Sequence, residues 1–66
     1  MEFKDTLKQL RNDANLSQKD LADALGTTAK TVSHWETGYT EPTIAQLISL
    51  ADFFDTSIDE LVGRIG

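Results

Sequence analysis

The sequence predicts an all-α fold, a compact bundle of five short helices in one domain that spans residues 1–66. Apolar residues recur at helical spacing along most of the chain, and no segment alternates apolar and polar residues as a half-buried strand does. A helix-start pattern also occurs three times, a serine or threonine followed three positions later by an acid or an amide. These pairs are Ser17 with Asp20, Thr43 with Gln46, and Ser57 with Glu60.

The first helix is expected to be amphipathic and to end at Asn15. Its apolar face is formed by residues at i, i+4, i+7 and i+11, namely Phe3, Leu7, Leu10 and Ala14. Asn12 and Asn15 are both candidate stop residues, since asparagine tolerates the left-handed backbone of a helix end. The apolar spacing continues to Ala14, which favours Asn15.

Residues 17–37 are predicted to form two short helices joined by a tight turn. Ser17 would cap the first helix, and Gly26 would supply the turn, because glycine most easily adopts the backbone that a sharp connection requires. Thr28 would cap the second helix, which should end at Gly38. Such a unit holds its second helix away from the body of the protein, where it can enter the major groove of DNA.

This second helix, Ala29–Thr37, has two faces when its residues are projected at about 100° each. Three residues fall together on the side expected to face the core: Val32, Trp35 and Glu36. Lys30 and His34 lie nearly opposite, on a polar side with small neighbouring residues. Lysine and histidine can both donate to guanine O6 or N7, so this side is a candidate surface for reading DNA bases.

The fourth and fifth helices are expected to follow Thr43 and Ser57, and Pro42 discourages an earlier start of the fourth. The expected buried side of the fourth helix consists of Ile44, Leu47, Leu50, Ala51 and Phe54. The short last helix carries Ile58, Leu61 and Val62 and should close at Gly63.

Four apolar residues of this part are hard to bury in a monomer of five short helices: Ile48, Phe53, Ile58 and Val62. They could form a self-association patch, or the domain could wrap its own last helix around them. Self-association is favoured, because one helix reading one half-site rarely suffices for specificity on DNA.

Composition excludes several classes of protein. Sixty-six residues leave no room for a second core, and an enzyme cleft would take much of the first. With no cysteine and one histidine, the chain lacks a metal-ligand set, and no cofactor is expected. No apolar run can cross a membrane and no leader opens the chain. A cytoplasmic location is therefore expected, with nucleoid association when DNA is bound.

The overall charge is acidic, −5 with a pI of about 4.5, whereas non-specific nucleic-acid binders are usually basic. The acids cluster toward the two ends of the sequence. Between residues 26 and 39, Lys30 and His34 face only Glu36, which is expected to point inward. A protein that is neutral to basic on the side of residues 26–39 and acidic elsewhere is compatible with weak, salt-sensitive binding to DNA.

Four blocks in order carry a family resemblance: LKQLR, LSQKDLADALG, TTAKTVSHWETG and EPTIAQLISLADFFDTSIDELVG. Together they resemble the Cro and phage-repressor class of prokaryotic and phage helix-turn-helix proteins, often called the XRE family. The resemblance implies a lambda-repressor-like bundle in which Gln18–Leu25 crosses the DNA backbone and Ala29–Thr37 is the recognition helix. It also implies a sequence-specific transcriptional regulator, with repression favoured. Such proteins act as homodimers on palindromic operators with half-sites about 34 Å apart.

The resemblance assigns roles to individual residues. Base contacts are expected from Thr28, Ala29, Lys30, Ser33 and His34. Phosphate contacts are expected from Gln18, Lys19, Thr37, Gly38 and Tyr39. In the family, the positions of Arg11 and Glu36 form an internal ion pair that locks the recognition helix to the first helix, and the helical phase of Glu36 agrees with this.

Other functions stay open. The loop after the recognition helix, with Tyr39, Thr40 and Glu41, is not basic as it often is in relatives. A protein-interaction or antitoxin module on the same fold is therefore the alternative. No nucleophile–base pair, phosphate loop or small-molecule effector site is recognisable, which argues against an enzyme.

Overall fold

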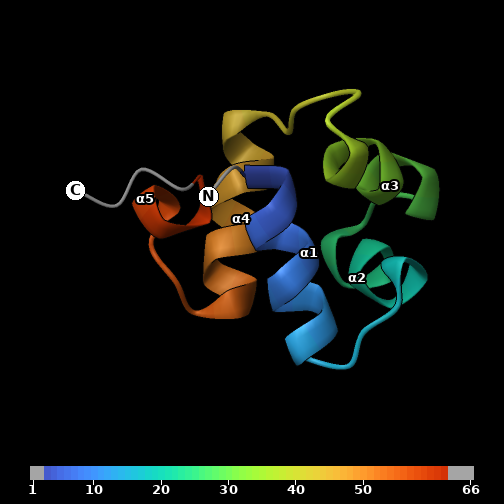
Figure 1. Ribbon diagram of the computed structural model, residues 1–66, viewed down its shortest axis with the longest axis horizontal. Coiled ribbons are helices and arrows are strands. Elements are labelled where there is room, and N and C mark those ends of the chain that lie inside the picture. Colours follow the sequence, from blue (N-terminus) through green and yellow to red (C-terminus); the bar gives the residue numbers. More distant parts are fainter. Residues whose placement is uncertain (1–2, 63–66) are drawn as a thin grey trace.

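A computed structural model describes residues 3–62 and confirms the all-α prediction (Figure 1). Within that range the elements are α1 (Phe3–Asp13), α2 (Gln18–Leu25), α3 (Ala29–Thr37), α4 (Ile44–Phe54) and α5 (Ile58–Leu61), with no strand between them. The α2 and α3 helices lie together at one end of the long axis, and α5 lies at the other end (Figure 1). Gly63, the expected end of the last helix, lies outside the described residues.

Helix starts follow the predicted caps. The Ser17 hydroxyl accepts the Asp20 N–H while the Asp20 carboxylate accepts the Ser17 N–H, both at 3.0 Å. Thr43 and Gln46 make the same reciprocal pair at the start of α4. Single cap bonds from the helix backbone to Thr28 and Ser57 begin α3 and α5. Local side-chain chemistry therefore sets where four of the helices start.

Helix ends follow the predicted stop residues. Asn15 has φ 59°, and the Leu16 N–H reaches back to the Arg11 carbonyl at 3.1 Å, which closes α1. Gly26 and Gly38 are also left-handed, with φ of 73° and 80°, and end α2 and α3 as expected. Asp55 ends α4 in the same conformation, which was not anticipated.

The core is built from all five helices. Its buried residues are Leu7, Leu21, Ala22, Val32, Trp35, Leu50, Ala51 and Leu61, with Phe3, Leu10, Leu25, Leu47 and Phe54 packed around them. This places the turn unit of α2 and α3 directly on the hydrophobic core. The outer side of α3 is left to solvent.

Two expected core residues are exposed instead. Ile44 is 76% exposed, because α4 begins there and burial rises only along the helix, from partly buried Leu47 to fully buried Leu50. Ala14 is exposed because α1 ends at Asp13 and the chain has already left the helix. Both predictions were wrong because apolar spacing gives the phase of a helix, but not where that helix or its neighbours begin and end.

The Ser17–Asp20 cap makes stability depend on pH. The backbone hydrogen bond from Ser17, followed by the bond to its side chain, lowers the pKa of Asp20. Because the unfolded chain then binds a proton more readily than the folded one, this contribution is fully present above the unfolded pKa of about 3.9. It is lost as the pH falls through the lower folded pKa.

We therefore expect Asp20→Ala to lower the melting temperature at pH 7, by an amount that shrinks below about pH 4. Circular dichroism melts from pH 2 to pH 7 measure this difference. Ser17→Ala is the matched control, since its lost hydroxyl does not titrate and most of its deficit should persist in acid. A pH-independent deficit for Asp20→Ala would contradict the prediction.

Candidate nucleic-acid interface

The two faces of α3 lie as the sequence predicts. Val32 and Trp35 are buried, at 0% and 2% exposure, whereas Lys30 is exposed on the other side. On α3 itself, Ala29, Lys30, Ser33 and His34 span one arc of about 140°, and Thr28 is the N-cap that precedes the helix. Thr28 is exposed, and Ala29, Ser33 and His34 are partly buried. Lys30 thus lies on the exposed side of the helix with Ser33 and His34 on either side of it, whereas Ala29 borders the side that carries Glu36.

His34 is less free than the sequence suggested. Its ring packs against that of Tyr39, with centroids 4.7 Å apart and planes tilted by 54°. Its carbonyl oxygen accepts the Tyr39 N–H at 2.9 Å and the Thr37 hydroxyl at 3.3 Å. The imidazole still belongs to the outward side of α3, but one of its neighbours is the loop that follows.

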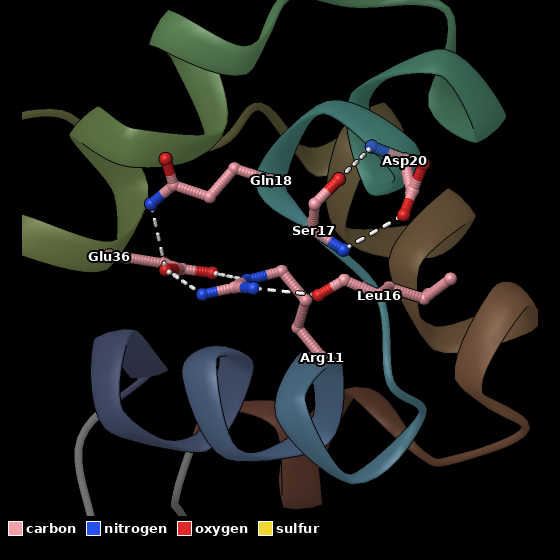
Figure 2. Close-up of polar contacts among 6 residues, drawn as sticks. All are labelled: Arg11, Leu16, Ser17, Gln18, Asp20 and Glu36. Carbon is pink, nitrogen blue, oxygen red and sulfur yellow. Dashed lines mark hydrogen bonds and ion pairs between the residues drawn. The ribbon is translucent and has the colours of Figure 1, made fainter.

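Arg11 and Glu36 form the expected ion pair (Figure 2). Arg11 Nε donates to Glu36 Oε2 at 2.7 Å, and Nη2 donates to Oε1 at 3.1 Å. The side chains are only 11% and 3% exposed. The hydrogen bond to the Glu36 carboxylate raises the pKa of Arg11 further above its usual value. A bidentate pair of this kind fixes both distance and orientation between α1 and α3.

The same guanidinium also reaches the start of α2. Arg11 Nη1 donates to the Leu16 carbonyl at 2.7 Å, just before the Ser17 cap (Figure 2). That carbonyl follows the end of α1 and would otherwise need another donor. One arginine therefore ties together the end of α1, the α1–α2 connection and α3.

Gln18 has a partner that the sequence did not reveal. Its amide Nε2 donates to Glu36 Oε1 at 3.1 Å, so α2 is joined to α3 through the same carboxylate (Figure 2). The identity of the donor is settled by chemistry, because an ionised carboxylate can only accept. One amide N–H of the expected phosphate donor is thus already engaged inside the protein.

Lys19 is also paired. Its Nζ lies 3.0 Å from Asp23 Oδ2, one helical turn on, and both side chains are largely exposed. The hydrogen bond to Asp23 raises the pKa of Lys19. Its positive charge is kept but lies beside a negative one, which weakens the field that a phosphate would meet. The i,i+4 spacing of the two residues could have revealed this pair.

The loop after α3 brings a further cation close to the candidate phosphate contacts. A Cβ atom built on Gly38 would lie 3.5 Å from Lys4 Cδ and 3.9 Å from Lys4 Nζ. The Lys4 ammonium therefore lies by the C-terminal end of α3, where the helix dipole favours positive charge. Tyr39, the next residue, is 76% exposed. Sequence reasoning missed Lys4, because only the packing of α1 against α3 brings it there.

The two candidate dimer residues on α4, Ile48 and Phe53, do not share one side of the helix. Ile48, Phe53 and Ile58 are 47%, 43% and 39% exposed, and Val62 is partly buried. Ile48 and Phe53 are five positions apart, about 140° around α4, and so lie on opposite flanks of its buried stripe. Exposed Ile44 extends the Ile48 flank. On α4, the residues of the predicted patch are therefore divided between two flanks of the helix.

Within residues 3–62, no group of three or more histidine, cysteine or acidic residues is arranged to hold a metal ion. No helix in that range is both long enough and apolar enough to cross a membrane.

Comparison with known proteins places this geometry in a family. Residues 7–61 match the family model described as helix-turn-helix. The chain is 45% identical over 60 residues to the HTH-type transcriptional regulator AnsR of Bacillus subtilis, covering 91% of this chain and 52% of AnsR. It is 36% identical to the cryptic phage CTXphi transcriptional repressor RstR of Vibrio cholerae, covering 97% of this chain and 57% of RstR. The chain thus spans about half the length of these relatives.

Solved structures agree on the fold. A transcriptional regulator from Listeria innocua superposes with a TM-score of 0.92 at 37% identity, over 98% of this chain and 61% of that one. The P22 c2 repressor superposes with a TM-score of 0.91 at 23% identity, over 98% of both chains, which shows the shared lambda-repressor-like architecture. The hydroxypropylphosphonic acid epoxidase of S. wedmorenis matches at 38% identity with a TM-score of 0.82. That match covers 91% of this chain but only 32% of the enzyme.

Proposed function

The chain belongs to the helix-turn-helix family, and we propose from this that it is a sequence-specific double-stranded DNA-binding regulator of transcription, acting as a repressor. The resemblance to the Cro and phage-repressor class is confirmed by the family match and by the relatives. Residues 1–66 would act as one DNA-binding domain, with the helix-turn-helix unit at about 17–37. It would work in the cytoplasm, where prokaryotic and phage DNA lies.

One observation carries this proposal. The α3 helix is locked to the protein by Glu36 and by buried Val32 and Trp35, while Lys30 on its other side faces solvent. A rigid helix that presents a polar side outward is what major-groove reading requires. The fold also occurs within a larger enzyme, which matches 91% of this chain over only 32% of its own length. AnsR and RstR, of which this chain covers 52% and 57%, are transcriptional regulators, and these relatives support our proposal of a non-enzymatic role.

We assign the contacts as follows. Base edges would be read by Thr28, Ala29, Lys30, Ser33 and His34. Phosphates would be held by Gln18, Lys19, Thr37, Gly38 and Tyr39, with Gln18 using its second amide N–H or its backbone N–H at the start of α2. Lys4 would add positive charge near the loop. Because Lys19 is paired with Asp23, contacts to DNA phosphates should contribute modestly to the binding free energy. Contacts to the base edges should then contribute a correspondingly larger share.

A homodimer on a palindromic operator is the assembly we propose. One α3 helix covers only one half-site, and two copies related by a two-fold axis would read half-sites 10–10.5 base pairs apart, about 34 Å. The contact would use one flank of α4, either that of Ile48 or that of Phe53, with Ile58 and Val62 near the end of the chain. Because the two flanks lie on different sides of α4, a substitution on each can show which one forms the dimer contact.

Selection of bound duplexes from a random pool tests both parts of the proposal. We expect enrichment of inverted half-sites at that spacing. An aspartate at one flank, in Ile48→Asp or Phe53→Asp, should abolish the enrichment of paired sites and leave single half-sites. If neither variant changes the pairing, the assigned dimer contacts are wrong.

A protein-interaction or antitoxin module is the second candidate. The net charge of −5 favours this second candidate, and so does the pairing of Lys19, one of the proposed phosphate contacts, with Asp23. Failure of the wild-type chain to enrich any DNA sequence would support this candidate over the first.

A further inference from the structure

The contact between His34 and Tyr39 is built into the end of α3. The two rings have centroids 4.7 Å apart and planes tilted by 54°, within the range of a favourable aromatic pair. His34 is partly buried, whereas Tyr39 is 76% exposed. Tyrosine therefore contributes little to the core, and its main packing partner among the candidate DNA contacts is the histidine.

Backbone hydrogen bonds bring His34 and Tyr39 side by side. The His34 carbonyl oxygen accepts the Tyr39 N–H at 2.9 Å and the Thr40 N–H at 3.3 Å. It also accepts the Gly38 N–H and, at 3.3 Å, the Thr37 hydroxyl. Gly38, with φ 80°, turns the chain back so that residue 39 lies beside residue 34. The end of the helix thus places the Tyr39 backbone beside His34, and the ring contact completes the arrangement.

Resting on the DNA-binding function proposed above, we propose that Tyr39 is a positioning residue for sequence reading. Its ring holds the His34 imidazole on the outward side of α3 in the orientation that meets a base edge. An unsupported surface histidine samples several rotamers and loses that freedom on binding. A histidine already held in place loses less, and it also excludes orientations that would suit other bases.

This role can be separated from a phosphate contact by chemistry. A phosphate contact uses the tyrosine hydroxyl, which Tyr39→Phe removes. Positioning uses the ring, which Tyr39→Phe keeps and Tyr39→Ala removes. Because Tyr39 is largely exposed, both variants should fold, and equal far-UV circular dichroism would verify this.

The experiment is a double-mutant cycle on DNA discrimination. The ratio of Kd values is measured for the selected site and for the same site changed at the base pair where His34→Ala reduces discrimination most without abolishing it. Loss of the hydroxyl, which was assigned above to a phosphate contact, should make Tyr39→Phe bind both sites more weakly by the same factor and so keep the wild-type ratio. Tyr39→Ala should reduce the ratio by about two- to tenfold. His34→Ala with Tyr39→Ala should lose no more than His34→Ala alone. Equal losses for phenylalanine and alanine, or additive losses in the double variant, would overturn the positioning role.

A second readout needs no DNA. The His34 ring protons should carry a ring-current shift in the NMR spectrum that persists in Tyr39→Phe and disappears in Tyr39→Ala. If the wild-type chain selects a site but this shift does not depend on the ring at position 39, only the positioning role fails. If the wild-type chain selects no site at all, the proposed function fails and the positioning role fails with it.

Discussion

Replacing Glu36 with alanine is expected to lower the free energy of unfolding by about 3–5 kcal/mol. The change would leave the Arg11 guanidinium, only 11% exposed, and the Gln18 amide without their shared acceptor. A chain of this length has a total stability of roughly 3–10 kcal/mol, so the loss could unfold much of the population at room temperature. Urea titration followed by the fluorescence of buried Trp35 measures the effect.

Three further variants distinguish the loss of the Arg11–Glu36 ion pair from a general effect of removing an acidic residue. Asp23→Ala removes the acid of an exposed ion pair and should change stability little. Glu36→Gln keeps one acceptor oxygen and should be milder than Glu36→Ala. Replacing both Arg11 and Glu36 by apolar residues of similar size should recover stability, because no charge is then buried alone. If Glu36→Ala and Asp23→Ala had equal, small effects, the structural importance of the pair would be refuted.

Lys30→Ala is expected to reduce discrimination at one position of each half-site by about 1–3 kcal/mol, roughly five- to 150-fold in relative Kd. The lysine is exposed on the outward side of α3 and can donate to guanine O6 or N7. Its removal should leave the melting temperature nearly unchanged, because no buried contact is lost. Competition binding with the selected site and its single-base variants measures the loss position by position.

Lys8→Ala is the matched control, since Lys8 is an exposed lysine on α1. It changes the net charge by the same amount and should leave the pattern of base preferences intact. Should Lys30→Ala weaken binding to every sequence equally, the lysine would be a phosphate contact and the base-reading assignment would be wrong.

Much of the fold could be predicted because its signals are local. The cap pairs of Ser17 with Asp20 and of Thr43 with Gln46 act within one helical turn, and Asn15 and Gly38 end helices through their own backbone preference. Ile44 was misplaced because its exposure depends on where other helices stop. Periodicity carries no information about that.

The site was predictable in outline only. The phase of α3 correctly separated buried Val32 from exposed Lys30. The pairing of Arg11 with Glu36, 25 residues apart, rested on family resemblance as well as phase. The Gln18 bond to Glu36 and the approach of Lys4 to Gly38 depend on tertiary packing, which no sequence spacing encodes.

Three nitrogen donors meet on the Glu36 carboxylate, and this arrangement limits which residues of α3 can be substituted freely. These three bonds and buried Val32 and Trp35 hold the inner side of α3, so residues on its outer side can be exchanged without removing them. Ala29, Lys30 and Ser33 could therefore be rewritten to address a different operator while the scaffold stays the same. A new DNA specificity would then require substitutions on the outer side of α3 and no change in the fold.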